Sequence, residues 1–254
     1  MPVSHLVVVM PAYNESEGIP VFLAEIEETL APVCARLSIV VVDDRSTDDT
    51  AAVLDAFALD RPSLTVVHAE ANRGHGPTAL RAYRAGLALD PDVLVHVDGD
   101  GQFLGTDIAR VATALAESGA DVVHGVRHSR SDPWFRRVLT GAVGLVVAGA
   151  VGRRVPDVNT PLRAYRPPVI AALVDAVPAD ALVPHVHFSL AEVRRGFTVR
   201  YASVRSIPRR GSEATGTMWG AVRAPKVPPR RLREFTRRAA VELWRYSLSP
   251  RRPS

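Results

Sequence analysis

Residues 93–102 of the chain, VLVHVDGDGQ, decide its fold class. The apolar run at the start is typical of a buried strand, and it ends abruptly in two aspartates one residue apart. In an open α/β sheet, ligands bind at the carboxyl ends of the strands, so we expect Asp98 and Asp100 to lie at a site. Neighbouring carboxylates repel one another unless a cation neutralises them, and oxygen ligands suit Mg²⁺ or Mn²⁺. The alternative is a solvated turn, because Asp and Gly are ordinary turn residues.

Strand and helix patterns alternate on both sides of this stretch. We expect strands at 5–10, 38–42, 64–68, 93–97 and 121–126, and helices at 18–30, 48–60, 77–89 and 106–118. This order predicts an α/β fold with a mostly parallel central sheet that is flanked by helices on both faces.

The second half of the chain has a different pattern. Residues 134–151 predict an amphipathic helix or a helix pair, and residues 157–166 predict a loop leading into a short strand. Further helices are expected at 168–177 and 185–194, and a last strand at 198–204. Residues 207–230 are rich in Gly, Pro and Arg, which is typical of a loop, and 231–248 predict a basic amphipathic helix. We therefore expect one domain over 1–206 and an appended segment over 207–254.

Composition excludes several classes of protein. The single Cys34 excludes an internal disulfide framework and fits a reducing compartment, and no secretory signal is visible. The longest gently apolar stretch, 138–151, falls short of the roughly 20 residues that cross a bilayer, so no integral span is expected.

Charge is distributed unevenly along the chain. Residues 194–254 carry 16 Lys and Arg residues against 3 Asp and Glu residues, whereas residues 1–193 carry 15 against 24. A basic tail binds anionic lipid, nucleic acid or an anionic substrate, or is simply solvated. No recognised nucleic-acid motif accompanies the arginines, so we expect no nucleic-acid partner.

Four polar loops follow expected strands, and each suits ligand binding. They are Pro-Ala-Tyr-Asn-Glu at 11–15, Val-Asp-Asp-Arg-Ser-Thr-Asp at 42–48, Asn-Arg-Gly-His-Gly at 72–76 and Asp-Gly-Asp-Gly-Gln at 98–102. Any one of these loops suits a plain polar connector equally well. In this order and spacing they together indicate a ligand-binding site at the carboxyl edge of the sheet.

These four motifs resemble the family 2 inverting glycosyltransferases, which have the Rossmann-like, nucleotide-sugar-binding GT-A fold. The resemblance covers about residues 3–205. Within the family the chain is most similar to the dolichol-phosphate and polyprenyl-phosphate sugar transferases, on the evidence of Gln102, Gly-Val-Arg at 125–127 and Leu-Arg-Ala-Tyr-Arg at 162–166.

The resemblance implies a role for each matching position. The base and ribose of the nucleotide would be cradled by Pro11, Tyr13, Glu15, Val42 and Asp44. Asp98 and Gly99 would lie against the nucleotide, while Asp100 and Gln102 would coordinate the Mg²⁺ or Mn²⁺ that bridges the donor diphosphate. Arg127 and one of Arg209 or Arg210 would meet phosphate charge, which the planar fork of Arg suits; Asp100, Arg127 and Arg210 are thus the expected catalytic residues.

The implied reaction moves a hexosyl group, with inversion, from a GDP- or UDP-sugar to a polyprenyl phosphate. A lipid phosphate is already anionic and needs no general base, whereas a hydroxyl acceptor needs one. The base candidates are the loop after Asp157, His185 and His187, and for the two histidines a surface or packing role is the stronger interpretation. These transferases carry an Arg-x-x-Gly-x-Ser-Lys motif in the late loop, and residues 209–217, RRGSEATGT, depart from it and lack the lysine, so the acceptor stays open.

Two alternatives share the expected fold. One is a transferase that glycosylates a soluble or glycan hydroxyl, and the other is a catalytically silent module that binds a nucleotide sugar. The segment 231–248 places cations beside apolar residues, as interfacial helices do, and 134–151 suits an interfacial position, so we expect peripheral contact with the cytoplasmic, inner face of the membrane. A helix packed on the core at 134–151, and a solvated or docked helix at 231–248, suit the two patterns equally well.

Overall fold

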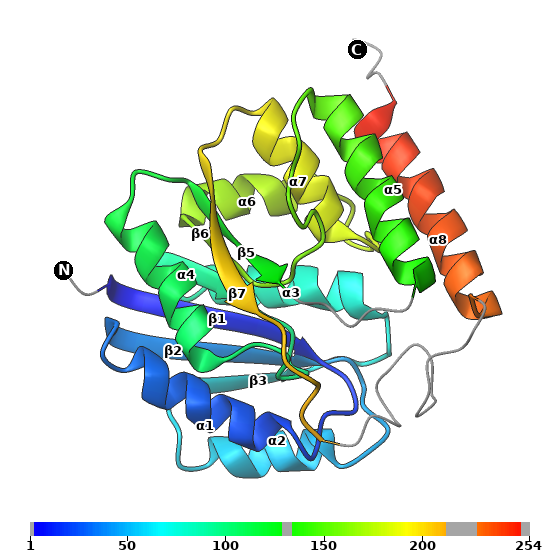
Figure 1. Cartoon of the computed structure of the whole chain (residues 1–254). Coiled ribbons are helices and arrows are strands. Elements are labelled where there is room, and N and C mark those ends of the chain that lie inside the picture. The colour runs from blue at the N-terminus through cyan, green and yellow to red at the C-terminus, as the bar shows by residue number, and fades with distance from the viewer. Residues whose placement is uncertain (1–2, 129–133, 212–227, 250–254) are drawn as a thin grey trace.

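The computed structural model describes residues 3–128, 134–211 and 228–249, and its centre is one seven-stranded sheet (Figure 1). The strands are β1 (Val3–Ala12), β2 (Cys34–Asp43), β3 (Leu64–His68), β4 (Val93–His96), β5 (Val122–His128), β6 (Arg163–Tyr165) and β7 (Val199–Arg205). The helices are α1 (Ile19–Leu30), α2 (Thr50–Ala58), α3 (His75–Leu87), α4 (Gly105–Glu117), α5 (Trp134–Val151), α6 (Pro167–Asp175), α7 (Pro184–Arg194) and α8 (Arg230–Leu243), with a π-helical turn, η1 (Trp244–Leu248), after α8.

The strand order is β3-β2-β1-β4-β6-β5-β7, and every strand except β6 runs in one direction. In the centre, Leu6 of β1 lies between Leu37 of β2 and Val93 of β4. The prediction of a mostly parallel sheet is therefore confirmed. Because the six parallel strands end at the same edge, the loops that follow them gather there, and this edge positions the site.

The side chains of β1 alternate between two apolar layers, as the two-residue period of a strand requires. Leu6 and Val8 pack with α1, α2 and α4, while Val7 and Val9 pack with α3, α6 and α7. Helices thus cover both faces of the sheet, which explains why the strand runs are continuously apolar instead of alternating with polar residues.

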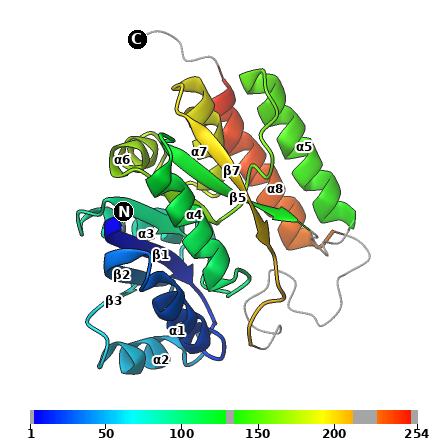
Figure 2. The same ribbon diagram turned by 60° about the vertical axis from the view of Figure 1, so that its left-hand side comes forward.

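A third apolar cluster joins α5, α7 and α8. Figures 1 and 2 both show α8 beside α5, with α7 next to them. The cluster consists of Val147, Val155, Val158, Val186, Leu190 and Leu243. Residues 134–151 form one helix, so the alternative of a helix pair is wrong. Among the described residues, no helix is both long and apolar enough to cross a membrane.

Most expected elements occur within a few residues of their predicted bounds. The strands β1 and β2 are longer than predicted at both ends: β2 already begins at Cys34, and the paired residues continue to Ala12 and Asp43 in the polar loop sequence. Much of the expected loop at 207–230 lies outside the described residues, and the boundary between 1–206 and 207–254 stays a prediction.

Candidate active site

The loops after β1, β2 and β4 are tied together by backbone hydrogen bonds. The Asp44 amide donates to Ala12 O at 2.9 Å, and the Gly99 amide donates to Pro11 O at 3.1 Å. A Cβ on Gly99 would lie 2.8 Å from Pro11 O, so this close approach requires glycine. Pro11 and Val42 are buried register partners in the sheet. Both lie at the ends of their strands, next to the polar loops, and Tyr13 in the first loop is half-buried; their contact with a donor stays a prediction.

Asp98 and Asp100 lie together after the end of β4, and the protein compensates the negative charge of their carboxylates poorly. Asp98 Oδ1 is buried, and within the described residues it has no hydrogen-bond donor; His75 Nε2 lies 3.5 Å away, at ion-pair distance. The backbone amide of Gln102 donates to Asp100 Oδ1 at 3.1 Å. Burial, reinforced by the charge of Asp98, raises the pKa of Asp100 to about 6. The two carboxylates thus favour a cation or a proton between them.

Glu15 adds a third carboxylate to this cluster and is paired with a distant arginine. Arg209 Nε donates to Glu15 Oε2 at 3.0 Å, and Arg209 Nη2 donates to Glu15 Oε1. Burial raises the pKa of Glu15 to about 8 against the lowering effect of Arg209, and Asp100 and Asp98 add to the rise. The segment after β7 therefore brings a guanidinium to Glu15, and the expected contact of Arg209 with phosphate stays a prediction.

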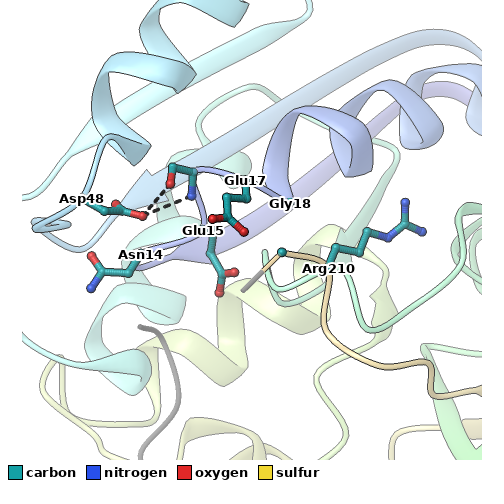
Figure 3. A pocket seen from close by; sticks show the side chains of 8 residues that line it. Asn14, Glu15, Glu17, Gly18, Asp48 and Arg210 are labelled. Atoms are coloured by element: carbon teal, nitrogen blue, oxygen red, sulfur yellow. Dashed lines mark hydrogen bonds between the residues drawn. The ribbon is translucent and has the colours of Figure 1, made fainter. Parts of the chain in front are cut away.

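Arg210 holds the loop after β4 and is directed elsewhere. Its backbone amide donates to Asp100 O at 3.2 Å, its Nε donates to Gly101 O at 3.2 Å, and its Nη2 donates to Glu25 of α1. Figure 3 shows its side chain directed away from Glu15. In this structure the Arg210 guanidinium braces the 98–102 loop against α1, and its contact with phosphate stays a prediction.

Arg127 lies at the carboxyl end of β5, at the same edge of the sheet, and forms a bidentate pair. Its Nε donates to Asp157 Oδ2 at 2.6 Å and its Nη2 donates to Asp157 Oδ1 at 2.8 Å. The loop of Asp157 is held from below by buried Arg163, which donates to Val158 O at 2.8 Å and to Thr160 O at 2.9 Å. A phosphate group that reaches Arg127 would therefore meet an arginine already fixed in orientation.

Asp44 fastens the third loop to the second. Its carboxylate accepts hydrogen bonds from the Arg73 amide at 2.9 Å and from the Gly74 amide at 2.8 Å. Both oxygens are engaged by the backbone, so the structure gives Asp44 a framework role beside the predicted contact with base or ribose. His75 follows directly and begins α3.

Next to this cluster lies an open pocket, shown in Figure 3. Asp48 fixes one wall by accepting from Ser16 Oγ at 2.8 Å and from the Thr50 amide at 3.0 Å. Partial burial alone would raise the pKa of Asp48, but the hydrogen bonds from Thr50 and Ser16 lower it. The pocket is lined by Asn14, Glu15, Ser16, Glu17, Gly18, Asp48, Arg210 and Gly211.

The two histidines considered as general bases lie inside the protein. His185 Nε2 pairs with Tyr83 Oη at 3.0 Å, and His187 bonds Glu242 Oε1 at 2.9 Å and Ser247 Oγ at 2.5 Å. Both rings are buried, and burial lowers the pKa of His185 well below its usual value. The packing interpretation is confirmed for both.

Sequence reasoning missed two residues of the site, His75 and Asp157. His75 stood within a recognised loop, between Gly74, which has a positive φ, and Gly76, which contacts the backbone of Ala181, and this pair of glycines was a usable signal. Asp157 was considered only as part of a loop that offers a base. Its pairing with Arg127 joins positions 30 residues apart and has no local signal.

The residues at the end of β4 suit a divalent metal shared with a ligand. Asp98 carries a buried oxygen without a donor, and Asp100 and Gln102 contribute further oxygen atoms of the kind that Mg²⁺ and Mn²⁺ prefer. Among the described residues, no group of three or more His, Cys, Asp or Glu side chains is arranged to hold a metal alone. Magnesium sites with one or two carboxylates take their remaining ligands from phosphates and water, so the donor set fits a metal that arrives with a diphosphate.

The family follows from comparison with known proteins. The model of the family described as "Glycosyl transferase family 2" matches residues 7–167, a range that runs from within β1 past β6 and includes the aspartate pair. The chain belongs to glycosyl transferase family 2.

Curated relatives of this family 2 chain act on lipid phosphates, according to their names. An undecaprenyl-phosphate 4-deoxy-4-formamido-L-arabinose transferase of Serratia proteamaculans is 32% identical over 184 residues, which are 72% of this chain and 55% of the relative. A polyprenol monophosphomannose synthase of Mycolicibacterium smegmatis is 29% identical over 205 residues, 78% of this chain and 76% of the relative. The chain thus spans little more than half of the first relative. The predicted similarity to polyprenyl-phosphate sugar transferases is confirmed.

Solved structures place the family 2 chain among GT-A glycosyltransferases. A mannosyltransferase of Pyrobaculum calidifontis in complex with GDP-Man and Mn²⁺ superposes with a TM-score of 0.58 at 22% identity, covering 83% of this chain and 59% of that one. Glucosyl-3-phosphoglycerate synthase of Mycobacterium tuberculosis, in complex with Mn²⁺, UDP and glucosyl-3-phosphoglycerate, gives 0.67 at 16% identity, covering 98% and 81%. The predicted GT-A fold is confirmed, and the expectation of a glycosyltransferase is confirmed at the level of the family.

Proposed function

We propose that the chain transfers a hexosyl group, with inversion, from a nucleoside-diphosphate sugar to a polyprenyl phosphate. The observation that carries this proposal is the pair Asp98 and Asp100, with a donorless buried oxygen and a raised pKa, at the edge where the strand-end loops meet. The named activities of the sequence relatives support the acceptor class.

In the proposed complex, Asp100 and Gln102 hold Mn²⁺ or Mg²⁺ at the donor diphosphate. The ion would supply positive charge that stabilises the departing diphosphate. Asp98 and Gly99 lie against the nucleotide, and Tyr13, Glu15 and Asp44 border its base and ribose. The complexes of the structural neighbours with GDP-Man and with UDP, both with Mn²⁺, agree with a GDP- or UDP-sugar donor.

The chain's own residues orient the two reactants. Arg127, fixed by Asp157, meets phosphate charge from the side of β5, and Arg209 adds a guanidinium from the segment after β7. An acceptor phosphate attacks the anomeric carbon from the face opposite the diphosphate and loses no proton that needs a base. A hydroxyl acceptor would need a base, but Asp157 is neutralised by Arg127 and the rings of His185 and His187 are buried. These contacts favour the phosphate acceptor.

We further propose that α5 and α8 contact the inner face of an anionic membrane. Both helices expose large apolar side chains next to cations, and interfacial helices bind lipid through this combination. The exposed apolar residues are Trp134, Val138, Leu145 and Val146 in α5, Val241 in α8, and Trp244 and Tyr246 in the adjoining η1. The exposed arginines of α8 are Arg230, Arg231, Arg233, Arg237 and Arg238. We expect binding to vesicles that contain phosphatidylglycerol and no binding to phosphatidylcholine vesicles at equal salt. Equal binding to both kinds of vesicle, or binding to neither, would contradict the proposal.

The experiment that tests the transfer is a donor and acceptor panel. Purified protein with MnCl₂ or MgCl₂ is given GDP- and UDP-hexoses together with a polyprenyl phosphate, or with water-soluble hydroxyl acceptors. We expect release of nucleoside diphosphate and a glycosyl-phosphoryl lipid of inverted anomeric configuration by NMR. Transfer to the soluble acceptors alone would show that the acceptor is a hydroxyl and not a lipid phosphate. Donor binding in calorimetry without any turnover would indicate a silent binding module.

A further inference from the structure

Helix α8 contacts the segment before α7 through one carboxylate, Glu242. Both of its oxygens accept from the Leu182 amide at 2.9 Å, and Oε1 also accepts from the Val183 amide at 3.4 Å. These amides precede α7, whose N-cap residue, Val183, makes no side-chain cap of its own. A carboxylate at a helix N-terminus satisfies amides that lack intrahelical partners and interacts favourably with the helix dipole. Glu242 thus caps α7 from a different helix, about 60 residues away in sequence.

The surroundings of Glu242 keep it charged and in place. Partial burial alone would raise its pKa, but hydrogen bonds from His187 and from the Leu182 amide lower it. His187 pairs with Glu242 through Nε2 and with Ser247 through Nδ1, so hydrogen bonds join α7 to both α8 and η1. Leu243, the next residue, packs into the apolar cluster with Val158 and Val186.

The segment that Glu242 holds forms a wall against the first turn of α3. A Cβ on Gly76 would lie 2.1 Å from Ala181 O and 2.7 Å from Leu182 O, so the two backbones are in direct contact. The residue before Gly76 is His75, whose Nε2 lies 3.5 Å from Asp98 Oδ1. On its other side, the same loop is fastened to Asp44 through the Arg73 and Gly74 amides.

We propose that Glu242 is a positioning residue of the donor site: by binding the amides before α7, it presses residues 181–182 against the first turn of α3 and fixes His75 opposite Asp98. This inference rests on the proposed function for the identity of the ligand. It gives the C-terminal helix, which follows the segment matched by the family, a part in shaping the site. Contact between α8 and a membrane would then act on the same wall.

The test compares Glu242→Ala with Glu234→Gln. Glu234 lies on the same helix and is exposed, with an ion pair to Arg230 at 2.7 Å, so its change controls for altered charge on α8. Well below the melting temperature, we expect Glu242→Ala to weaken binding of GDP or UDP with MnCl₂ about tenfold in calorimetry, because small misplacements of a binding wall are costly. Glu242→Gln keeps one acceptor oxygen for Leu182, so it should restore part of the affinity. Glu234→Gln should match the wild type.

Hydrogen exchange measured by mass spectrometry gives a second readout that needs no nucleotide. Glu242→Ala should increase exchange both in residues 178–188 and in residues 72–80. Faster exchange confined to 178–188, or nucleotide affinity equal to that of Glu234→Gln, would overturn the positioning role. Wild-type protein that binds neither nucleotide would refute the proposed donor site, and the exchange pattern would still decide whether Glu242 fixes the first turn of α3.

Discussion

The buried ion pair between Arg163 and Glu192 gives a prediction on stability that the structure makes quantitative. Arg163 Nη1 lies 3.3 Å from Glu192 Oε1, and both side chains are almost completely inaccessible to solvent. Arg163 also donates to Val158 O, Thr160 O and Ser189 Oγ. Breaking a buried pair by removing one partner costs about 3–5 kcal/mol, because the other charge stays buried without its counter-charge. In Arg163→Met, Glu192 loses the guanidinium and keeps Tyr165 Oη and His124 Nε2 as neighbours. For a protein of this size each kcal/mol lowers the melting temperature by about 2–4 °C, so Arg163→Met should lower it by about 6–20 °C.

The assay is thermal and urea unfolding of Arg163→Met, Glu192→Leu and the double variant. The double variant removes both charges, so it should lose at least about 1 kcal/mol less than the sum of the single changes. His124, whose Nε2 lies 3.0 Å from Glu192 Oε2, has its pKa lowered by burial and stays neutral in the double variant. A loss below about 1 kcal/mol for Arg163→Met, with strictly additive changes, would refute this reasoning.

Two further predictions concern the site itself. Gly76→Ala should destabilise the protein by about 1–3 kcal/mol in urea unfolding, because the new Cβ would collide with Ala181 O. The control Gly119→Ala, which has open space around its Cβ, should be neutral or slightly stabilising. Equal effects of the two changes would contradict the close contact at Gly76. The affinity for Mn²⁺ with nucleotide should fall about tenfold per pH unit below about pH 6, because Asp100 must lose its proton to bind metal. Because its pKa is raised, ionising Asp100 costs stability as pH rises from about 4 to 6, so Mn²⁺ should raise the melting temperature more at pH 7 than at pH 5. Asp98→Asn should move the midpoint of the Mn²⁺ affinity to lower pH, because the charge of Asp98 raises the pKa of Asp100. An Mn²⁺ affinity that does not change from pH 5 to 8 would exclude this linkage.

Sequence alone predicted the features that local chemistry determines. The apolar runs of β1, β2 and β4 specify buried parallel strands, and a polar loop after each strand predicts where the site lies. The bounds were less certain, because the ladder between β1 and β2 continues through polar residues as far as Asp43. One helix in place of a helix pair at 134–151 follows from packing against α7, which the sequence does not display.

The partners of the charged residues could not be predicted from sequence. The pair of Glu15 with Arg209 joins residues 194 positions apart, and Glu242 reaches Leu182 across 60 positions. Such pairs depend on the completed fold, since a charged residue has no local pattern that names its partner. Leu-Arg-Ala-Tyr-Arg at 162–166 carried the resemblance, yet the buried Arg163 is a framework residue that holds the loop of Asp157.

Binding of a metal-bound diphosphate donor at Asp100 is the central claim, and one measurement tests this binding most directly. The rate of hexosyl transfer to polyprenyl phosphate is measured with MnCl₂ and with EDTA for the wild type, Asp100→Asn and the control Asp60→Asn, whose exposed side chain lies at the opposite edge of the sheet. Loss of electrostatic stabilisation of the diphosphate should lower kcat about 10²-fold or more for Asp100→Asn, and EDTA should abolish transfer by the wild type and Asp60→Asn. Transfer by Asp100→Asn at the wild-type rate, or transfer by the wild type undiminished in EDTA, would contradict the account.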